Sequence, residues 1–470
     1  MRVLLVVPPS SWKEGFGKFN TSIQPYFPLG LAYVAAFLEK DGHEVKVIDA
    51  VVTKSNFDDI ERVTRDFSPH IVGQQTIFSN LESCYKIAKI AKRINPDIKV
   101  VLGGSHITMY PEETIRDESI DFGVYGEGEF VMKNLLDCLQ NGVDFSGVPG
   151  IVWKDGKNII KNKPQPFIEN LDILPFPAKH LFPMNKYHAT SHLRGIRTLS
   201  MIASRGCPFK CVFCWIQQSF GRTVRYHSPK RVVEEMRILK EEYSADSIRF
   251  WDDSFTVNKK WVYEFCDLLN AENLNLPWSC FTRVDLVDEK ILRKLKEAGC
   301  YQIYYGIESG SQRLLNLINK GITLDQARIS IKLAKEAGIE TICSYMLALP
   351  GETREESEQT IKFAIEIESD YVQISLTIPH ISGEAFYKLC SQYGTILKDE
   401  LHKATLYDYP TYIPYGRTQE ELKECIRKAY KRFYLRPSYI IRRILKLQGL
   451  SLRKYFILFY TGLKVLLWKR

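Results

Sequence analysis

The sequence lacks any long hydrophobic run. Although 45% of its 470 residues are hydrophobic, no stretch reaches the roughly 18 consecutive apolar residues that a membrane-spanning helix needs. The apolar run Met1–Val7 ends at Pro8 and Pro9, and it is too short for the hydrophobic core of a signal peptide. Without an export signal, the eleven cysteines are not expected to form disulfides, and a cytoplasmic location is predicted.

Acidic residues are absent after Glu424, whereas thirteen Lys and Arg follow it. In residues 439–447 and 452–468, basic residues are interspersed among apolar and aromatic ones, which is typical of a helix lying on a membrane surface. Each basic residue near an anionic leaflet contributes about 1 kcal/mol. A helix packed on the protein with a solvated basic face, and a nucleic-acid contact, are the alternatives. No RNA-binding motif accompanies the charge, so we expect no nucleic acid and favour peripheral contact at the inner membrane surface, which hints at a lipid-like substrate.

The length of the chain predicts more than one domain. Residues 1–145 alternate strand-like and helical patterns, which predicts an α/β domain with a doubly wound, flavodoxin-like parallel sheet. Residues 146–195 contain a predicted hairpin and five closely spaced prolines, as expected of a connector. Residues 196–400 predict a second α/β domain, a partial (β/α)6 TIM barrel. Residues 401–470 are predicted to form a helical, basic C-terminal segment.

Apolar runs place the strands of both sheets. The first domain has predicted strands at Val3–Val7, Glu44–Ile48, Ile71–Gln74, Lys99–Leu102 and Phe122–Tyr125. The barrel has predicted strands at Thr198–Ala203, Ser247–Trp251, Trp278–Thr282, Gln302–Gly306, Glu340–Met346 and Tyr371–Leu376.

Three cysteines, Cys207, Cys211 and Cys214, follow the first predicted barrel strand with the spacing CxxxCxxC. A structural zinc site closes with four ligands, whereas a [4Fe-4S] cluster held by three thiolates leaves one iron open. The other cysteines form no second CxxC and are expected in the core. Cys280 and Cys343, on predicted barrel strands, are weaker candidates to face a substrate.

Later barrel strands also end in polar motifs. Asp252 and Asp253 follow the second strand, where their carboxylates either accept hydrogen bonds from an ammonium group or cap the next helix. Glu308 and Ser309 follow the fourth strand, and packing explains poorly a glutamate that ends an apolar strand. Leu349–Thr353, with the sequence LPGET, is either part of the site or a turn with a helix cap.

Small and polar residues stand at three strand ends of the first domain. Each glycine alone is explained by a tight turn. Together they predict a ligand site, because ligands of doubly wound sheets bind beyond the carboxyl ends of the strands. No GxGxxG follows the first strand, which disfavours a dinucleotide. The candidate residues are Gly73, Gln74, Gly103, Gly104, Ser105, Gly126 and Glu127.

The cysteine spacing, with Phe213 before the last cysteine, resembles the signature of radical S-adenosylmethionine (SAM) enzymes. The glycine-rich strand ends resemble the cobalamin-binding domain that precedes the barrel in one branch of that family, so the resemblance covers residues 1–400. It implies a cluster ligated by the three cysteines, with SAM on its open iron and reductive cleavage of SAM to a 5′-deoxyadenosyl radical. It also implies cobalamin on the glycine-rich loops. The SAM-facing residues that it implies are Phe213, Asp252, Asp253, Glu308 and Ser309.

One feature departs from the simplest form of this pattern. The DxHxxG motif that supplies a lower cobalt ligand in many cobalamin proteins is absent. His70 and His106 lie near predicted strand ends, but ordinary surface or core histidines explain them better. Arg283, after the third barrel strand, either pairs with the SAM carboxylate or is solvated.

The resemblance implies an enzyme that methylates an unactivated carbon of a small molecule, with flavodoxin or ferredoxin as electron donor. Oxidative ring formation or rearrangement, as in the anaerobic magnesium-protoporphyrin monomethyl ester cyclase, needs the same cofactors and stays open. A non-enzymatic corrinoid- or zinc-binding protein is the third interpretation. The sequence alone does not identify the substrate.

Overall fold

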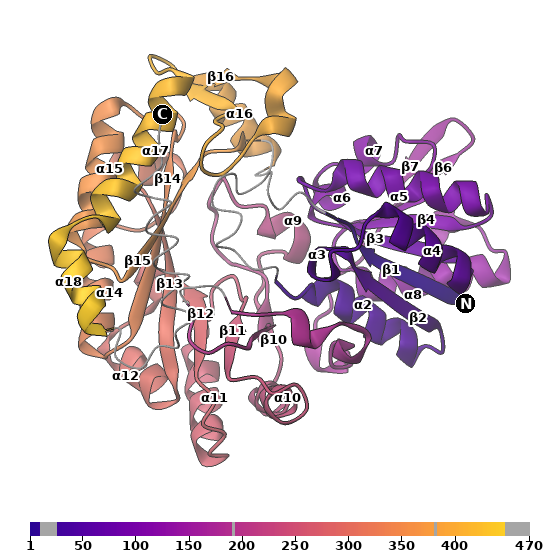
Figure 1. The fold of residues 1–470 in the computed structure, drawn as a ribbon, viewed down its shortest axis with the longest axis horizontal. Helices are drawn as coiled ribbons and strands as arrows, with labels where there is room; N and C mark the ends of the chain where they lie inside the picture. The colour runs from indigo at the N-terminus through magenta and orange to yellow at the C-terminus, as the bar shows by residue number, and fades with distance from the viewer. Residues whose placement is uncertain (10–25, 190–192, 380–382, 447–470) are drawn as a thin grey trace.

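A computed structural model describes residues 1–9, 26–189, 193–379 and 383–446. The predicted basic segment 452–468 lies outside these residues. Within them, no helix combines the length and apolar character needed to cross a membrane. Figure 1 shows two α/β units side by side, with the C-terminal helices on the outer side of the second.

The N-terminal sheet has seven strands in the order β2-β1-β3-β4-β5-β6-β7. The first five pair in parallel, and their order 2-1-3-4-5 is that of flavodoxin-like folds. The predicted flavodoxin-like sheet is therefore confirmed. The bounds are β1 Arg2–Val7, β2 Glu44–Asp49, β3 Ile71–Thr76, β4 Lys99–Gly104, β5 Phe122–Val124, β6 Ile151–Asp155 and β7 Asn158–Lys161.

Helices cover both faces of this sheet. α2 and α8 share one apolar core with it, and α4 and α5 share the other. Local sequence sets the helix ends: Asn56 and Asp59 form a capping box at the start of α4, and Gly142 ends α8 in the left-handed region. The bounds are α2 Leu29–Lys40, α3 Ala50–Thr53, α4 Phe57–Phe67, α5 Leu81–Ile94, α6 Ser105–Met109, α7 Pro111–Thr114 and α8 Gly128–Asn141.

The hairpin β6–β7, which the sequence places in the connector, extends the N-terminal sheet. β6 pairs antiparallel with β5, and Phe122 lies opposite Trp153. Phe145 packs edge-on against both rings, at centroid distances of 4.9 and 5.5 Å. This aromatic contact explains why the hairpin joins the sheet, since cross-strand aromatic pairs stabilise neighbouring strands.

The second unit is a curled parallel sheet with the strand order β15-β14-β13-β12-β11-β8. Its six strands confirm the predicted partial barrel. Residues such as Met201 and Phe250 point outward into the core beneath the helices. Strand and helix bounds are β8 Thr198–Met201, β11 Ser247–Phe250, β12 Trp278–Thr282, β13 Cys300–Glu308, β14 Glu340–Leu347, β15 Tyr371–Leu376, α10 Pro229–Glu241, α11 Lys259–Ala271, α12 Glu289–Glu297, α13 Gln312–Leu317, α14 Leu324–Glu336 and α15 Arg354–Glu366.

The C-terminal segment covers the open edge of the barrel at β15. The hydroxyl of Tyr430 bonds both the N–H and the C=O of Ile374, and that of Tyr434 does the same at Val372. Two tyrosines one helical turn apart thus satisfy the outward-facing groups of alternate strand residues, which protects an edge that would otherwise pair with another strand. The remaining bounds are α16 Glu384–Tyr393, β16 Gly394–Ile396, β17 Tyr412–Pro414, α17 Gln419–Tyr434 and α18 Pro437–Lys446.

Candidate active site

The cysteine loop is the connection between two short antiparallel strands, β9 (Ser204–Arg205) and β10 (Arg225–Tyr226). Gly206 begins the loop with φ +99°, and a Cβ there would lie 2.4 Å from the carbonyl oxygen of Thr223, so only glycine fits. Val212 N–H donates to the carbonyl of Ile318 over 3.1 Å. Gly206 thus fixes the base of the loop, and the bond from Val212 attaches the loop to Ile318, the residue that follows α13.

A cavity of about 300 Å³ opens beside this loop at the carboxyl ends of the barrel strands. The structure therefore brings the three predicted cluster cysteines together with Phe213, Asp252 and Asp253. The lining residues are Cys207, Phe209, Cys211, Phe213, Cys214, Ile216, Trp251, Asp252, Asp253, Phe281, Arg283 and Lys320.

The thiols are suited to an iron–sulfur cluster. Burial raises the pKa of Cys207 above its usual value and that of Cys214 to about 12, so a metal's positive charge is needed to hold them as thiolates. Among the described residues, no three His, Cys, Asp or Glu side chains are arranged to hold one metal ion. Three cysteines match the protein ligands of a cubane cluster with one open iron, whereas a structural zinc site closes with four ligands.

Asp252 and Asp253 have different surroundings. Asp252 is buried and accepts hydrogen bonds from Ala203 N–H at 3.1 Å and from the Ser204 hydroxyl, which ties β11 to the start of the cysteine loop. Asp253 accepts one from Gly206 N–H, and burial, followed by the charge of Asp252, raises its pKa to about 7. No cationic side chain of the described residues pairs with Asp253. It therefore suits an ammonium group in the cavity.

The helix-cap interpretation of these two aspartates is wrong. α11 begins only at Lys259, and its N-cap is Asn258, whose side chain accepts from Trp261 N–H. The aspartates instead stand in the loop between β11 and that helix, where their positions depend on the cysteine loop.

Lys320 is a cavity residue that the sequence did not reveal. Its Nζ lies 2.7 Å from Oε1 of Glu308, and both side chains are buried. Glu308 has φ +75° at the register shift between β13 and β14, a conformation that costs about 1–3 kcal/mol and is concentrated at functional sites. Glu308, which its strand-end position made a candidate, is thus connected to the cavity by its bond to Lys320, twelve residues later in the chain.

Arg283 and Ser309 are both engaged within the protein. Arg283 forms two 2.9 Å bonds with Asp285, lies 3.7 Å over the ring of Phe209 and approaches Cys211 Sγ at 3.8 Å. It is buried, so the solvated alternative is wrong. The Ser309 hydroxyl lies 3.2 Å from that of Thr360 on α15, and its predicted contact with SAM stays a prediction.

Two weaker candidates have structural roles. Cys280 and Cys343 are buried in the core between barrel strands and helices, so the suggestion that they face a substrate is wrong. In the LPGET stretch, Glu352 accepts from Leu349 N–H at 2.7 Å and Thr353 caps α15 within a capping box, which confirms the turn-and-cap interpretation.

The strand ends of the N-terminal sheet form a surface of small residues. Gly104 has φ +107°, and a Cβ there would lie 2.6 Å from the carbonyl oxygen of Thr76, whereas a Cβ on Gly126 would meet nothing within 4 Å. Thr108 accepts from Gly126 N–H at 3.1 Å and donates to Gly104 at 2.7 Å, so it joins two of the loops. The predicted corrinoid surface therefore consists of small residues and backbone groups.

The other candidates of this domain point elsewhere or remain untested. Gly73 lies within β3, where a Cβ would clash with Leu5 at 2.7 Å, so it serves packing. The buried side chain of Gln74 donates to the carbonyl oxygen of Cys84, while Gly103 lies at the end of β4 and Ser105 begins α6, which follows directly. The carboxylate of Glu127 bonds two barrel arginines. The corrinoid-binding roles of these residues stay predictions.

Neither histidine suits the lower face of a corrinoid. His70 is exposed and precedes β3, at the amino edge of the sheet, where it accepts from Arg2 N–H at 2.9 Å. His106 is buried, bonded to Thr114 at 2.9 Å and packed on Phe78. The ordinary surface and core interpretations are confirmed.

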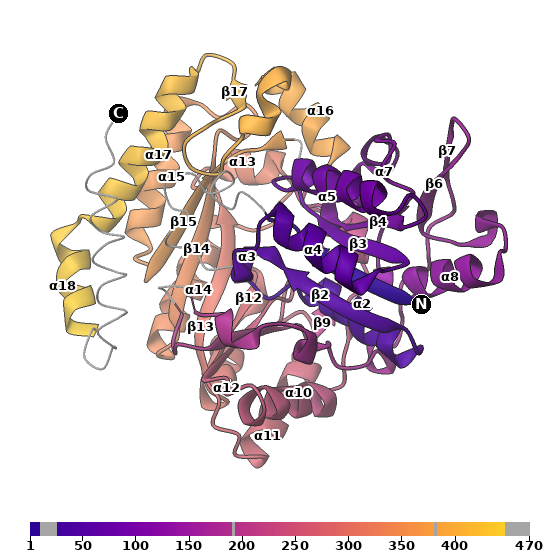
Figure 2. The same cartoon turned by 45° about the vertical axis from the view of Figure 1, so that its right-hand side comes forward.

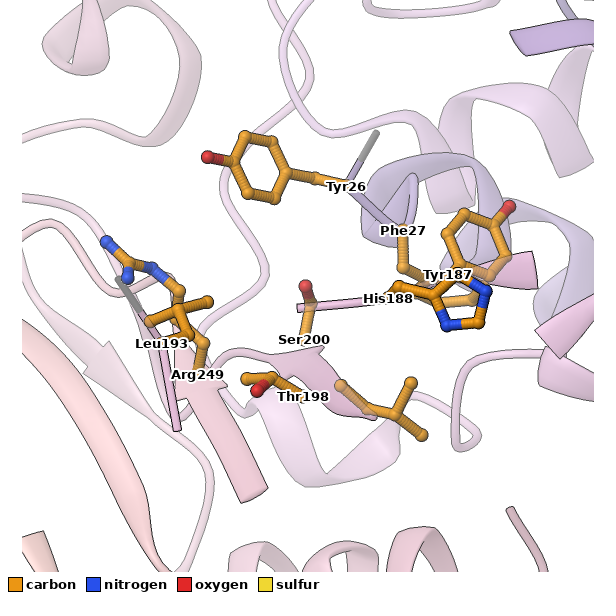
Figure 3. Close-up of a pocket in the computed structure, with 9 residues that line it drawn as sticks. Tyr26, Phe27, Tyr187, His188, Leu193, Thr198, Ser200 and Arg249 are labelled. Carbon is orange, nitrogen blue, oxygen red and sulfur yellow. The ribbon is translucent and has the colours of Figure 1, made fainter. Parts of the chain in front are cut away.

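A second, smaller pocket is lined by residues of β8 and β11 and by Tyr26 and Phe27 of the N-terminal domain (Figure 3). Arg249 and Ser200 line it, and Arg249 stacks on Trp251 and Phe281 at 4.9 and 4.5 Å. Tyr26, from the N-terminal domain, packs edge-on against Trp251. With a volume of about 10 Å³, the pocket accommodates about one water molecule and forms the floor of the barrel.

The two candidate ligand surfaces adjoin. α6, which follows the Gly103–Gly104 turn, contacts α9 (Ile216–Phe220), which follows Cys214. Figure 1 shows α9 between the two units. A ligand on the N-terminal strand ends is thereby brought close to the cysteine loop.

Comparisons with known proteins agree with this geometry. Residues 201–364 match the radical SAM superfamily and residues 20–136 match the B12 binding domain. The chain is 38% identical to an uncharacterized methyltransferase of Pyrococcus horikoshii, over 97% of both chains. It is 32% identical to the anaerobic magnesium-protoporphyrin IX monomethyl ester cyclase of Rubrivivax gelatinosus, over 94% of this chain and 78% of that one.

Among solved structures, the fold resembles that of TsrM, a radical S-adenosylmethionine methyltransferase from Kitasatospora setae with cobalamin and a [4Fe-4S] cluster bound. The TM-score is 0.68 at 19% identity, covering 83% of this chain and 75% of that one. The two matched domains imply a [4Fe-4S] cluster, SAM and cobalamin as cofactors. The chain belongs to the cobalamin-binding branch of the radical SAM superfamily.

Proposed function

We propose that this enzyme methylates an unactivated carbon of a small molecule. The observation that carries the proposal is the cavity in which Cys207, Cys211 and Cys214 meet Asp253 and Lys320, next to the open strand ends of the cobalamin-type domain. When bound, the cluster and SAM supply a 5′-deoxyadenosyl radical and the corrinoid supplies the methyl group.

The chain's own residues bind, orient and exclude water. The three thiolates hold the cluster, and the Asp253 carboxylate accepts hydrogen bonds from the ammonium group of SAM. Lys320 holds Glu308 at the rim of the same cavity. Phe209, Phe213 and Phe281, with Trp251, form an apolar wall that keeps water from a reactive radical.

Methylation is favoured over ring formation by the P. horikoshii relative, which is named a methyltransferase and is aligned over nearly the whole chain. The cyclase relative is less similar. The two reactions differ in the fate of the SAM methyl group. A methyltransferase transfers this group to the corrinoid and releases S-adenosylhomocysteine, which ring formation does not require.

The test uses the anaerobically reconstituted chain with methyl-deuterated SAM, hydroxocobalamin and titanium(III) citrate. We expect 5′-deoxyadenosine, and transfer of the labelled methyl group to the corrinoid with release of S-adenosylhomocysteine. Formation of 5′-deoxyadenosine without methyl transfer would favour ring formation or rearrangement. If no 5′-deoxyadenosine forms, the proposed cleavage of SAM by this protein is contradicted.

We further propose that an electron donor such as flavodoxin or ferredoxin serves the cluster, and that the basic C-terminus contacts an anionic membrane near a lipid-like substrate. Support for the membrane contact comes from the charge after Glu424 and from α18, where Ile440 and Ile441 are 42% and 59% exposed. Tyr439 of the same helix is buried, so the informative truncation ends at Lys446.

The membrane contact is tested by co-sedimentation with phosphatidylserine-containing vesicles, with phosphatidylcholine vesicles as the control. We expect the full chain to sediment only with the anionic vesicles, and less so at high salt. Equal sedimentation of the variant that ends at Lys446 would exclude the tail as the contact.

A further inference from the structure

Two arginines stand directly opposite each other at the base of the cysteine loop. Arg205 of β9 and Arg225 of β10 are cross-strand partners, and both are buried. Like charges in such a pair destabilise a ribbon, and a buried charge without a counter-ion is strongly destabilising. The base of the loop therefore needs negative charge from elsewhere.

That charge comes from the N-terminal domain. Glu127 spans the pair, with Oε1 2.8 Å from Arg205 and Oε2 2.7 Å from Arg225, and Glu129 lies 2.6 Å from Arg205. All four side chains are at most 7% exposed. Glu127 belongs to the turn between β5 and α8, one of the loops predicted to face the corrinoid, and Glu129 lies in the first turn of α8.

The connector and α2 complete this buried contact. Ile168 donates its N–H to Glu127 at 2.8 Å and accepts from Arg225 at 2.7 Å. The ring of Tyr33, on α2, lies 5.1 Å from the Arg205 guanidinium. Three separate parts of the chain thus meet at the two arginines.

The same short strand reaches the cavity on its other side. Next to Arg205, Ser204 donates its hydroxyl to Asp252, and Gly206 donates its N–H to Asp253. Cys207 follows immediately. Both glutamates and both aspartates are therefore bonded to one short segment of the chain, residues 204–206, and the first cysteine follows it directly.

We infer that Glu127 and Glu129 are positioning residues that hold the cysteine loop from the neighbouring domain, so that the β5–α8 turn and the cluster site are mechanically coupled. The inference rests on the proposed function only in assigning the cluster to this loop. The negative charges of Glu127 and Glu129, from the cobalamin-type domain, order the base of the loop.

The test is hydrogen exchange by mass spectrometry on the full-length chain before reconstitution. Glu127→Gln keeps the shape of the side chain but removes its charge. We expect peptides covering residues 203–226 to exchange at least about tenfold faster, because their order depends on these contacts. Peptides covering β13 and β14 should keep the wild-type rate.

Glu235→Gln is the matched control. Glu235 forms an equally buried ion pair with Lys179 at 2.6 Å, and the two side chains are 2% and 3% exposed. Among the residues that the structure describes, Glu235 has no hydrogen bond or ion pair with residues 203–226. We expect this variant to lose stability without faster exchange in residues 203–226. Equal acceleration in both variants, or uniform acceleration along the chain, would overturn the inference.

Glu129→Gln, which removes one ion pair instead of two, provides a milder variant if Glu127→Gln fails to fold. Arg205→Lys keeps the charge but cannot bridge both glutamates, so we expect exchange between that of the wild type and that of Glu127→Gln. A second readout is the electron paramagnetic resonance spectrum of the reduced, reconstituted cluster, which we expect to change in Glu127→Gln and not in Glu235→Gln. An unchanged spectrum together with unchanged exchange would overturn the inference even if the wild type cleaves SAM.

Discussion

At the carboxyl ends of its strands, the N-terminal sheet presents glycines and small hydroxyl side chains, whereas the barrel presents cysteines and buried charged side chains. A Cβ on Gly104 would clash with the Thr76 carbonyl oxygen, whereas a Cβ on Gly126 would meet no atom within 4 Å. Asp253 and Lys320 line a cavity of the barrel, and Glu308 is paired with Lys320. The difference agrees with the prediction that the N-terminal loops bind a corrinoid through shape, while the barrel binds SAM and a cluster through coordination and charge.

The largest effect is expected in the barrel, from Cys211→Ala. Loss of one of three thiolates prevents assembly of the cluster, so SAM cleavage should fall to background, by more than about a thousandfold, while the fold is retained. The measurement is 5′-deoxyadenosine formation, with circular dichroism for the fold. Cys138→Ala, on the half-buried face of α8, is the control, and full cleavage by Cys211→Ala would refute the ligand assignment.

In the N-terminal sheet, the addition of a single methyl group should be enough to weaken corrinoid binding. Gly104→Ala would place a Cβ 2.6 Å from the Thr76 carbonyl oxygen in a backbone with φ +107°. We expect corrinoid binding about tenfold to a hundredfold weaker and a stability loss of about 1–3 kcal/mol. SAM binding should be unchanged.

Absorbance titration with hydroxocobalamin measures this effect. Gly42→Ala separates strain from clash, because Gly42 has φ +83° but a Cβ there meets no atom within 4 Å. If the two variants bind the corrinoid equally well, the close approach at Gly104 has no bearing on the ligand.

Removing a charge should affect only the barrel. Lys320→Met leaves Glu308 as an unpaired buried carboxylate, which should lower stability by about 3 kcal/mol and weaken SAM binding about tenfold, equivalent to about 1.4 kcal/mol. Equilibrium dialysis with SAM and chemical unfolding measure the two effects. The double variant Lys320→Met with Glu308→Gln should regain stability but not SAM binding; recovery of both would show that the pair is only structural.

The smallest effect concerns the contact between the two regions. His227 bonds Asp172 of the connector at 3.2 Å and faces the Tyr33 hydroxyl at 3.4 Å. Burial, followed by the charge of Arg231, lowers its pKa from 6.5 to about 4; Arg205 and Glu235 also face it.

Because the unfolded chain binds this proton first, the stability contribution of neutral His227 is complete above pH 6.5 and is lost as the pH falls toward 4. The slope should reach about 1.4 kcal/mol per pH unit. Unfolding titrations between pH 7 and 4.5 should show a shallower slope for His227→Gln. Identical slopes would contradict the burial of a neutral histidine.

Most strands were predictable because their signal is local. The predicted barrel strand Trp278–Thr282 coincides with β12, and Tyr371–Leu376 coincides with β15. The predicted first strand of the barrel extends two residues beyond β8, because Ala203 turns to bond Asp252. The hairpin β6–β7 was predicted, but its pairing with β5 was not, since strand pairing is a tertiary property.

The site was predictable where one residue type carries the chemistry. Cys207, Cys211 and Cys214 are spaced for one cluster whatever surrounds them. By contrast, no local pattern marks Lys320, which matters only because its loop folds back onto Glu308. The choice between capping and binding for Asp252 depended on where α11 begins.

The sequence by itself determined the parallel strands of both sheets, through the spacing of apolar runs, and predicted the cluster ligands, through the spacing of three cysteines. Only the tertiary structure decided that Glu127 pairs with Arg205, 78 residues later in the chain. The physical reason is that periodicity and loop spacing act between near neighbours, whereas buried ion pairs form between charges that only the folded chain removes from water together. The cysteine loop is therefore specified by its own sequence but held in place by another domain.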